Sequence, residues 1–302
     1  MKRKPLVILF SVFGVFCLGL RFYQHLVMTD QSTGFIQTQY SDSWVGMEIA
    51  VAVMLLAIVL LGRLGDKFPA KPIERSKSLG IASLGMAAAS IFLTGQQIVM
   101  LSADFAELKS QMMQLAFQQY GGMLVKQLIY ILLAVLFTIF MLIYGVNLLN
   151  GGTMPRGLCV VPVLFTGYRL AMIFLDYFGL VRTVDINIEI ITLLFCMVFW
   201  HFFSKYNAQV KFDSSVKWLF GLGLSTALLC FINALPVYYL TISSMLGAAV
   251  QVRNLSPNLY FELITGVYIL IFLANAYSKT RFENRQPAER IENESVSQTP
   301  QN

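Results

Sequence analysis

Charged residues are scarce in this chain of 302 residues, at 13% of the total, about half their share in a soluble globular domain. Apolar residues make up 57%, and the mean hydropathy is +0.66. This composition excludes a soluble single-core protein, a disordered chain and a nucleic-acid-binding module. The net charge of +6 does not indicate nucleic-acid binding, because the basic residues form short clusters between apolar runs.

Residue types that catalyse reactions or bind metals are also few. The two histidines, His25 and His201, fall at opposite ends of the predicted bundle and cannot share one haem or metal ion. Neither a H-E-x-x-H motif, a G-x-S-x-G motif, a phosphate-binding loop nor a dinucleotide fingerprint occurs. We therefore expect no enzyme activity, no cofactor and no metal site. The cysteines form no C-x-x-C pair and are interpreted as small apolar side chains within predicted spans: Cys17, Cys159, Cys196 and Cys230.

Eight apolar stretches are long enough to cross about 30 Å of hydrocarbon, which takes about 20 helical residues. Lipid cannot satisfy free backbone N–H and C=O groups, so spanning segments without strand-like alternation must be helices. The sequence therefore predicts an all-α integral membrane helical bundle with eight transmembrane helices. Trp44, Trp200 and Trp218 fall near span ends and predict an interfacial aromatic belt. The predicted spans are Pro5–Val27, Val45–Leu61, Leu79–Leu101, Met123–Leu149, Leu158–Leu180, Ile186–Phe203, Val216–Ile242 and Leu259–Tyr277.

Lysine and arginine predict the orientation of these spans. One side of the predicted bundle carries 16 of them, whereas the other carries four: Arg21, Lys109, Arg182 and Arg253. The positive-inside rule then places both termini in the cytoplasm of a bacterial cell, with the protein in the cytoplasmic membrane. The basic start and first apolar run are similar to a signal peptide. No small-x-small cleavage site follows them, so we expect an uncleaved anchor.

Two polar segments flank the later spans. In the connection 102–122, Phe105, Leu108, Met112 and Leu115 recur at near-helical spacing. This pattern predicts an amphipathic helix on the outer membrane surface, either as a lid over the bundle or as a partner-binding surface. The bundle is expected to end at residue 277. The polar tail 278–302 is predicted to be disordered and cytoplasmic, with arginines near anionic lipid.

The halves 1–150 and 151–277 are similar when aligned four spans against four. The third and seventh stretches carry small residues four apart, Gly85 with Ala89 and Gly221 with Ser225, which permit close helix approach. Four spans per half would make a parallel repeat. The similarity has two explanations, duplication or the composition that apolar helices share. The polar residues that the alignment equates are Arg21 with Arg169, Asp30 with Asp176, Glu48 with Glu189, and Lys126 with Glu262.

Two stretches, "LRFYQ…TDQSTGF" and "RLAMIFLDYFGL", together resemble uncharacterised polytopic integral membrane proteins of clostridial-type bacteria. In that family a first span ends in an arginine, and an Asp-x-x-Thr-Gly-Phe turn follows. The resemblance implies a bacterial multi-pass membrane protein. It implies no activity, substrate or cofactor.

Ionisable residues within spans mark candidate sites, because each costs about 2.5–3.5 kcal/mol at mid-membrane on insertion scales. Most of them fall in the outer half of the predicted bundle, above an apolar inner half. They form interhelical ion pairs, line a pocket for a small polar or lipid-headgroup ligand, or follow a transport path. We expect the largest polar cavity to open outward, and Arg169 to pair with Glu189 or Glu48. The candidate ligand-binding residues are Arg21, Asp30, Glu48, Arg169, Asp176 and Glu189.

These observations favour a non-enzymatic sensing or scaffolding component with an outward-facing polar cluster. The alternative is a transporter or permease for a small solute or lipid, which requires polar residues to continue through the inner half. The expected partners are membrane lipid and a membrane or extracytoplasmic protein, with no nucleic acid.

Overall fold

The computed structural model describes residues 3–29, 37–63, 72–110, 113–152, 154–176, 184–209, 216–245 and 257–297. Within these ranges the architecture is all-helical, and eight helices are long and apolar enough to cross a membrane. The predicted all-α class is therefore confirmed. The long helices are α1 (Arg3–Tyr23), α2 (Ser41–Arg63), α3 (Lys77–Ser110), α4 (Met113–Asn150), α5 (Val161–Asp176), α6 (Val184–Ala208), α7 (Val216–Met245) and α8 (Pro257–Ser297). The short ones are the π-helix η1 (Gln24–Met28) and the 3₁₀ helices η2 (Thr38–Tyr40) and η3 (Arg156–Val160).

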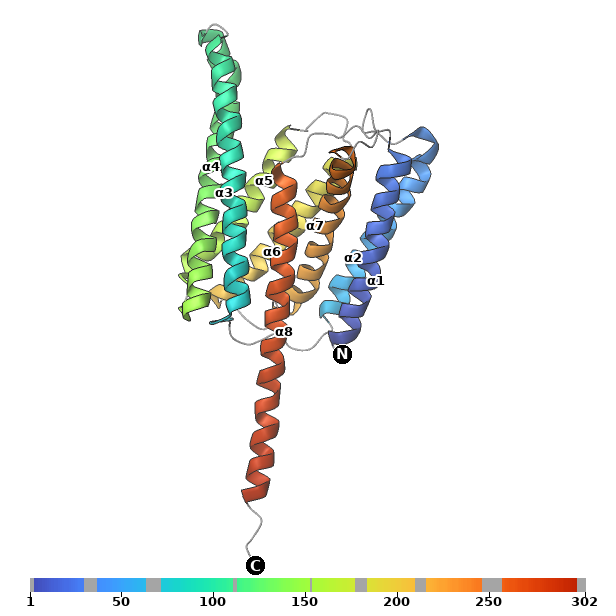
Figure 1. Ribbon diagram of the computed structural model, residues 1–302, viewed down its shortest axis with the longest axis vertical. Coiled ribbons are helices and arrows are strands. Elements are labelled where there is room, and N and C mark those ends of the chain that lie inside the picture. Colours follow the sequence, from blue (N-terminus) through green and yellow to red (C-terminus); the bar gives the residue numbers. More distant parts are fainter. Residues whose placement is uncertain are drawn as a thin grey trace, which may run out of the picture.

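Helix α7 is the centre of the bundle and packs against α1, α2, α6 and α8 (Figure 1). It is the most buried of the eight spanning helices, which explains why its sequence is apolar on nearly every face. Pro236 lies inside this helix, where the backbone loses one hydrogen-bond donor. Pro257 is instead the first residue of α8, a position that tolerates the missing donor.

Glycines set the closest helix contacts. A Cβ on Gly62 of α2 would lie 2.4 Å from the Gly221 Cα of α7, so the two backbones touch there. One turn further along α7, the Ser225 hydroxyl donates to the Leu55 carbonyl at 3.2 Å. The close approach expected at Gly221 and Ser225 is therefore confirmed.

The equivalent expectation for α3 is wrong at Gly85, where a Cβ would meet nothing within 4 Å. The close contact of α3 is made by Gly80, against Gly145 and Leu149 of α4. Five residues correspond to about 500° of helix rotation, so Gly85 points to another side of α3 than Gly80 does. Sequence spacing identified a small-residue pair but not the face of α3 that meets a neighbour.

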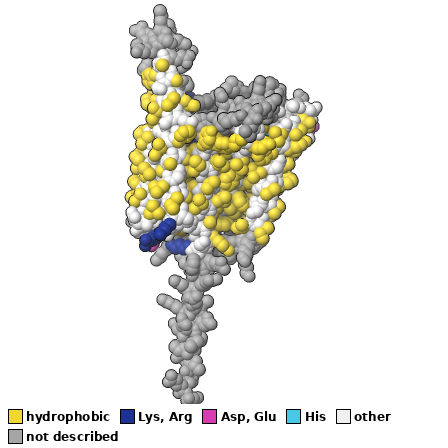
Figure 2. Space-filling view, in the orientation of Figure 1, with side chains coloured by type: hydrophobic (Ala, Val, Ile, Leu, Met, Phe, Trp, Pro, Cys, Tyr) yellow, Lys and Arg dark blue, Asp and Glu magenta, His cyan; other side chains and the backbone are white. Residues whose placement is uncertain are grey.

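Hydrophobic side chains cover the middle of the bundle surface in Figure 2. Exposed apolar side chains come from at least four helices, for example Ile8, Val53, Ile91 and Leu132. Basic side chains gather at one end of the bundle instead, the end at which both chain termini leave it (Figures 1 and 2). The described basic residues at helix ends or loops on that side are Arg63, Arg75, Lys77, Arg156, Lys205 and Lys279.

Helices α3 and α4 pack side by side and extend beyond the other helices at the end opposite the termini (Figure 1). They are 34 and 38 residues long, against about 20 needed to cross a membrane. The amphipathic surface helix predicted for 102–122 is therefore wrong: α3 continues to Ser110, and α4 begins at Met113. The near-helical spacing was correctly identified, but it belongs to two extended helices and not to one that lies on a surface.

Helix α8 extends beyond the bundle at the other end and continues to Ser297 (Figure 1). The sequence predicts disorder from residue 278, so the two differ over this segment. The helical stretch includes Pro287, which has no backbone N–H to donate, so no local pattern in this segment explains the difference.

Candidate functional site

A buried ionic group lies where α5, α7 and α8 meet. The Arg169 guanidinium of α5 is 3.2 Å from the Glu262 carboxylate of α8, and only 3% and 2% of these side chains are exposed. The other carboxylate oxygen of Glu262 accepts a hydrogen bond from the Asn233 side-chain amide of α7 at 2.6 Å. We call these three residues the ionic cluster. Both charges are satisfied within the protein, as their burial requires.

Side chains from three further positions surround the ionic cluster. The Phe261 ring lies 5.4 Å below the Arg169 guanidinium, a cation–π contact. Glu189 of α6 and Tyr130 of α4 are close enough to interact electrostatically with Arg169. Five helices, α4 to α8, thus contribute polar groups to one region, which couples their positions.

The structure separates four of the six predicted site residues into two groups. Arg21 of α1 is buried, donates to the Gln24 amide oxygen at 3.3 Å and interacts electrostatically with Glu48 of α2. Arg169 and Glu189 belong to the second group, on α5 and α6. Helices α1 and α2 pack against α7, whereas α5 packs against α4 and α6, so the two groups occupy different parts of the bundle.

The predicted partners of Arg169 are wrong in part. Its direct partner is Glu262, whereas Glu48 lies with Arg21, and Glu189 acts on Arg169 electrostatically. Asp30 lies outside the described residues, and Asp176 ends α5 with a side chain that the structure does not describe. A single outward-facing cluster of six residues is therefore not what the described part of the chain contains.

A chain of aromatic rings leads from the ionic cluster toward the end with the termini. Ring centroids are 5.6 Å apart for Phe261 and Phe137, and 5.8 Å for Phe137 and Trp200. They are 5.1 Å apart for Trp200 and Phe203, and 5.5 Å for Phe203 and Tyr144. All five side chains are buried. We call these residues the aromatic column; Trp200, predicted for an interfacial belt, is one of its central members.

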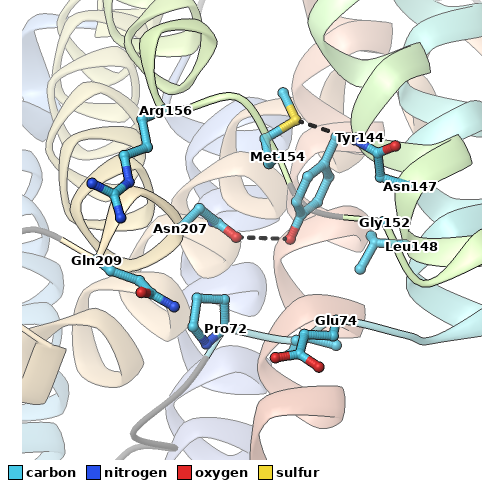
Figure 3. Close-up of a pocket in the computed structure, with 11 residues that line it drawn as sticks. Pro72, Glu74, Tyr144, Asn147, Leu148, Gly152, Met154, Arg156, Asn207 and Gln209 are labelled. Carbon is cyan, nitrogen blue, oxygen red and sulfur yellow. Dashed lines mark hydrogen bonds between the residues drawn. The ribbon is translucent and has the colours of Figure 1, made fainter.

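The aromatic column ends at a pocket near the basic end of the bundle. The Tyr144 hydroxyl donates to the Asn207 side-chain oxygen at 3.3 Å, and both residues line the pocket (Figure 3). Its volume is about 310 Å³. The walls come from the segment before α3, the end of α4, the α4–α5 connection and the end of α6. The lining residues are Pro72, Ile73, Glu74, Tyr144, Asn147, Leu148, Gly152, Met154, Arg156, Asn207 and Gln209.

This pocket lies at the opposite end from the expected outward cavity. The sequence predicts a polar region in the outer half that opens to the outside, but the ionic cluster itself is buried within the protein. The physical reason is that Glu262 pairs directly with Arg169, and Asn233 donates to the second carboxylate oxygen of Glu262, so this ion pair needs no water-filled cavity. Among the described residues, no group of three or more metal-binding side chains gathers at either place.

Sequence reasoning missed most of the pocket, and the reason lies in its construction. Glu74, Asn147 and Gln209 belong to connections or helix ends, where a polar residue in a membrane protein carries little signal. The sequence shows Asn233 and Glu262 as polar residues within apolar segments. Only the packing of the helices shows that Glu262 contacts Arg169 and that Asn233 contacts Glu262.

No family model matches the chain, and comparison with curated proteins and with solved structures gives no match.

Proposed function

We propose that this chain is a multi-pass protein of a bacterial cytoplasmic membrane, with both termini in the cytoplasm. The apolar belt in Figure 2 supports insertion, because exposed aliphatic side chains on many helices are stable in lipid and costly in water. The basic residues at the end with both termini support the orientation. Lipid is then the partner of the belt.

Within that membrane we propose a non-enzymatic sensing or scaffolding role. One observation carries this proposal: α3 and α4 project from one end of the bundle, α8 projects from the other, and α3 packs against α8 (Figure 1). At about 1.5 Å per residue, the 38 residues of α4 and the 41 of α8 measure about 57 and 61 Å, twice the hydrocarbon thickness. The projections offer surfaces for a protein partner on each side.

Contacts along α3 and α8 link the two projections. Near the termini, the Ser76 and Ser78 hydroxyls both donate to the Asn275 side-chain oxygen of α8, at 2.7 and 3.0 Å. The Lys279 ammonium of α8 donates to the Pro72 carbonyl at 2.8 Å. At the other end, the Phe92 and Tyr260 rings meet edge to face at 6.1 Å. We call the projecting ends of α3 and α4 the outer hairpin. Through these contacts, a displacement of the outer hairpin is transmitted to the projecting end of α8.

The alternative is a transporter for a small solute or lipid. Its substrate would pass both the ionic cluster and the pocket lined by Tyr144 and Asn207, which we call the inner pocket. The aromatic column separates them. On α4, Tyr130 beside the ionic cluster and Tyr144 at the pocket are 14 residues apart, or about 21 Å, and the column fills the distance between them. Transport requires this column to open, whereas the sensing or scaffolding role leaves it closed.

The four-plus-four repeat is also a proposal from the sequence. The repeat would equate α3 with α7. Helix α7 packs against α1, α2, α6 and α8, whereas the main neighbours of α3 are α4 and α8. The two helices that the repeat would equate therefore pack against different neighbours, whatever the origin of the two halves.

Hydrogen exchange in lipid nanodiscs tests the coupling. Replacing residues 104–120 with a short Gly/Ser turn removes the outer hairpin tip. If α3 and α8 act as one unit, amide exchange in residues 280–297 increases, whereas exchange in α1, which packs against α2 and α7, stays unchanged. Equal exchange in 280–297 before and after the replacement would overturn the coupling that the role requires.

A further inference from the structure

The inner pocket contains two opposite charges that the described protein leaves unpaired. Arg156 lies at the start of η3, and Glu74 lies in the segment before α3. Both line the pocket, and within the described ranges neither side chain takes part in a hydrogen bond or an ion pair. Figure 3 shows Arg156 on the side of Gln209, and Glu74 toward the side of Asn147 and Leu148. A ligand between them would meet a cation on one side and an anion on the other.

The rest of the wall supplies neutral hydrogen-bonding groups held in place by the fold. Tyr144 and Asn207 hold one another at 3.3 Å at the end of the aromatic column. The Asn147 amide contacts the Met154 sulfur at 3.9 Å. Three side-chain amides, with one tyrosine hydroxyl, therefore surround the space between the charges: Asn147, Asn207 and Gln209.

Gln209 has an unusual backbone conformation for this position. Its φ is +57°, in the left-handed region that residues other than glycine rarely adopt. Its backbone N–H donates to the Tyr206 carbonyl at 3.3 Å, which ends α6 with a tight turn. A left-handed residue directly after the last residue of a helix is a common way to end one. Here it places the Gln209 side chain at the pocket wall.

We propose that this pocket binds a small zwitterion, with its anionic group at Arg156 and its ammonium group at Glu74. A guanidinium pairs well with a carboxylate or a phosphate, and a carboxylate pairs well with an ammonium. The volume of about 310 Å³ equals about ten water molecules at liquid density, which suits a free amino acid or a phosphoethanolamine group. Both side chains are exposed to water, and a ligand with a single charge would pair with only one of them.

The zwitterion has two sources, a solute of the cytoplasm or the headgroup of a membrane lipid, and both carry the same chemistry. The pocket ends at the closed aromatic column, so ligand enters and leaves at the end with the termini. Binding at this site does not depend on coupling between α3 and α8. The proposal of a zwitterion site can therefore be tested independently of the sensing or scaffolding role, which the hydrogen-exchange experiment tests.

Calorimetry on the full chain in nanodiscs of phosphatidylglycerol, which has no amine, tests the proposal. The probes are serine, phosphoethanolamine, ethanolamine and inorganic phosphate. We expect serine or phosphoethanolamine to bind at least about tenfold more tightly than both singly charged probes. Phosphatidylethanolamine added to the nanodiscs identifies the headgroup as the source if it abolishes that binding, and the solute if it does not. Failure of both zwitterions to bind at millimolar concentration overturns the proposal.

Variants locate the binding in the pocket. Arg156→Gln and Glu74→Gln should each weaken zwitterion binding by about tenfold or more, because each removes one charge. Arg75→Gln is the matched control, since Arg75 is exposed next to Glu74 and does not line the pocket. In the double variant Arg156→Glu with Glu74→Arg, reversed binding should recover part of the affinity lost in the single variants. Equal weakening in Arg75→Gln, or unchanged affinity in both Gln variants, places the ligand elsewhere.

Discussion

The carboxylate of Glu262 lies 3.2 Å from the guanidinium of Arg169, although the two residues are 93 positions apart in the sequence. Both groups are withdrawn from water and lipid, and Asn233 satisfies the second carboxylate oxygen. A buried pair of this kind contributes little net stability, because desolvation offsets the attraction. Removing only one of the two charges is costly, since the remaining charge then has no partner. The pair therefore determines the relative position of α5 and α8 more than it adds to the stability of the protein.

The first prediction follows from this asymmetry. Glu262→Gln should destabilise the protein by about 3–5 kcal/mol, the range measured for broken buried pairs in soluble proteins. Changing both residues to leucine should recover most of that loss, because no charge then remains. Glu189→Gln is the control and should cost less, since Glu189 is only half-buried. Reversible unfolding in mixed detergent measures these variants together with Arg169→Leu and Glu262→Leu; strictly additive effects of these two single leucine changes in the double variant would contradict a direct pair.

The glycine contacts give a second prediction. Gly62→Ala should destabilise the bundle by about 1–3 kcal/mol, because the new methyl group would lie 2.4 Å from the Gly221 backbone, which cannot move aside alone. Gly85→Ala should be neutral or slightly stabilising, since its Cβ would meet nothing within 4 Å. Thermal melting in detergent compares the two. Similar melting temperatures for both variants would mean that α2 and α7 are not in backbone contact.

The sequence predicts the number and type of the helices because a membrane demands long apolar segments of nearly uniform length. That demand is local, and a window of about 20 residues contains it. The face that each helix presents is a different matter. Gly85 and Gly80 are equally small, and only the position of α4 makes Gly80 the contact.

Partners across the bundle were beyond sequence reasoning for the same reason. Glu189, Glu48 and Glu262 are all carboxylates near the ends of apolar segments, and each is a reasonable partner for Arg169. The choice depends on the order in which helices pack, and α8 lies beside α7 and α3 in a way that no local pattern indicates. Trp200 shows the same limit: it falls near the end of a predicted span, yet its ring is buried in the aromatic column.

The third prediction concerns topology. Single cysteines at Ser110, the last residue of α3, and at Ser297, the last residue of α8, should lie on opposite sides of the membrane. In a background without the native cysteines, a membrane-impermeant maleimide should label Ser110→Cys in intact cells. Ser297→Cys should react only after the membrane is opened. Labelling of both positions in intact cells would contradict the proposed span count between them.

The fourth prediction uses two native cysteines to test the contact of α6 with α7. The Cys196 and Cys230 sulfurs are 3.8 Å apart and buried, whereas a disulfide needs about 2.05 Å, so a shift of under about 2 Å brings them into bonding range. A protease site inserted in residues 210–215 lets the chain be cut between the two helices. After cleavage, a membrane-permeant oxidant such as iodine should convert the two thiols to a disulfide and keep both fragments together on a denaturing gel. Reductant should then separate the fragments, and Cys196→Ala, with Cys17 and Cys159 already replaced by alanine, should never join them. Fragments that stay apart after oxidation of the unmodified pair would show that these two faces of α6 and α7 do not meet.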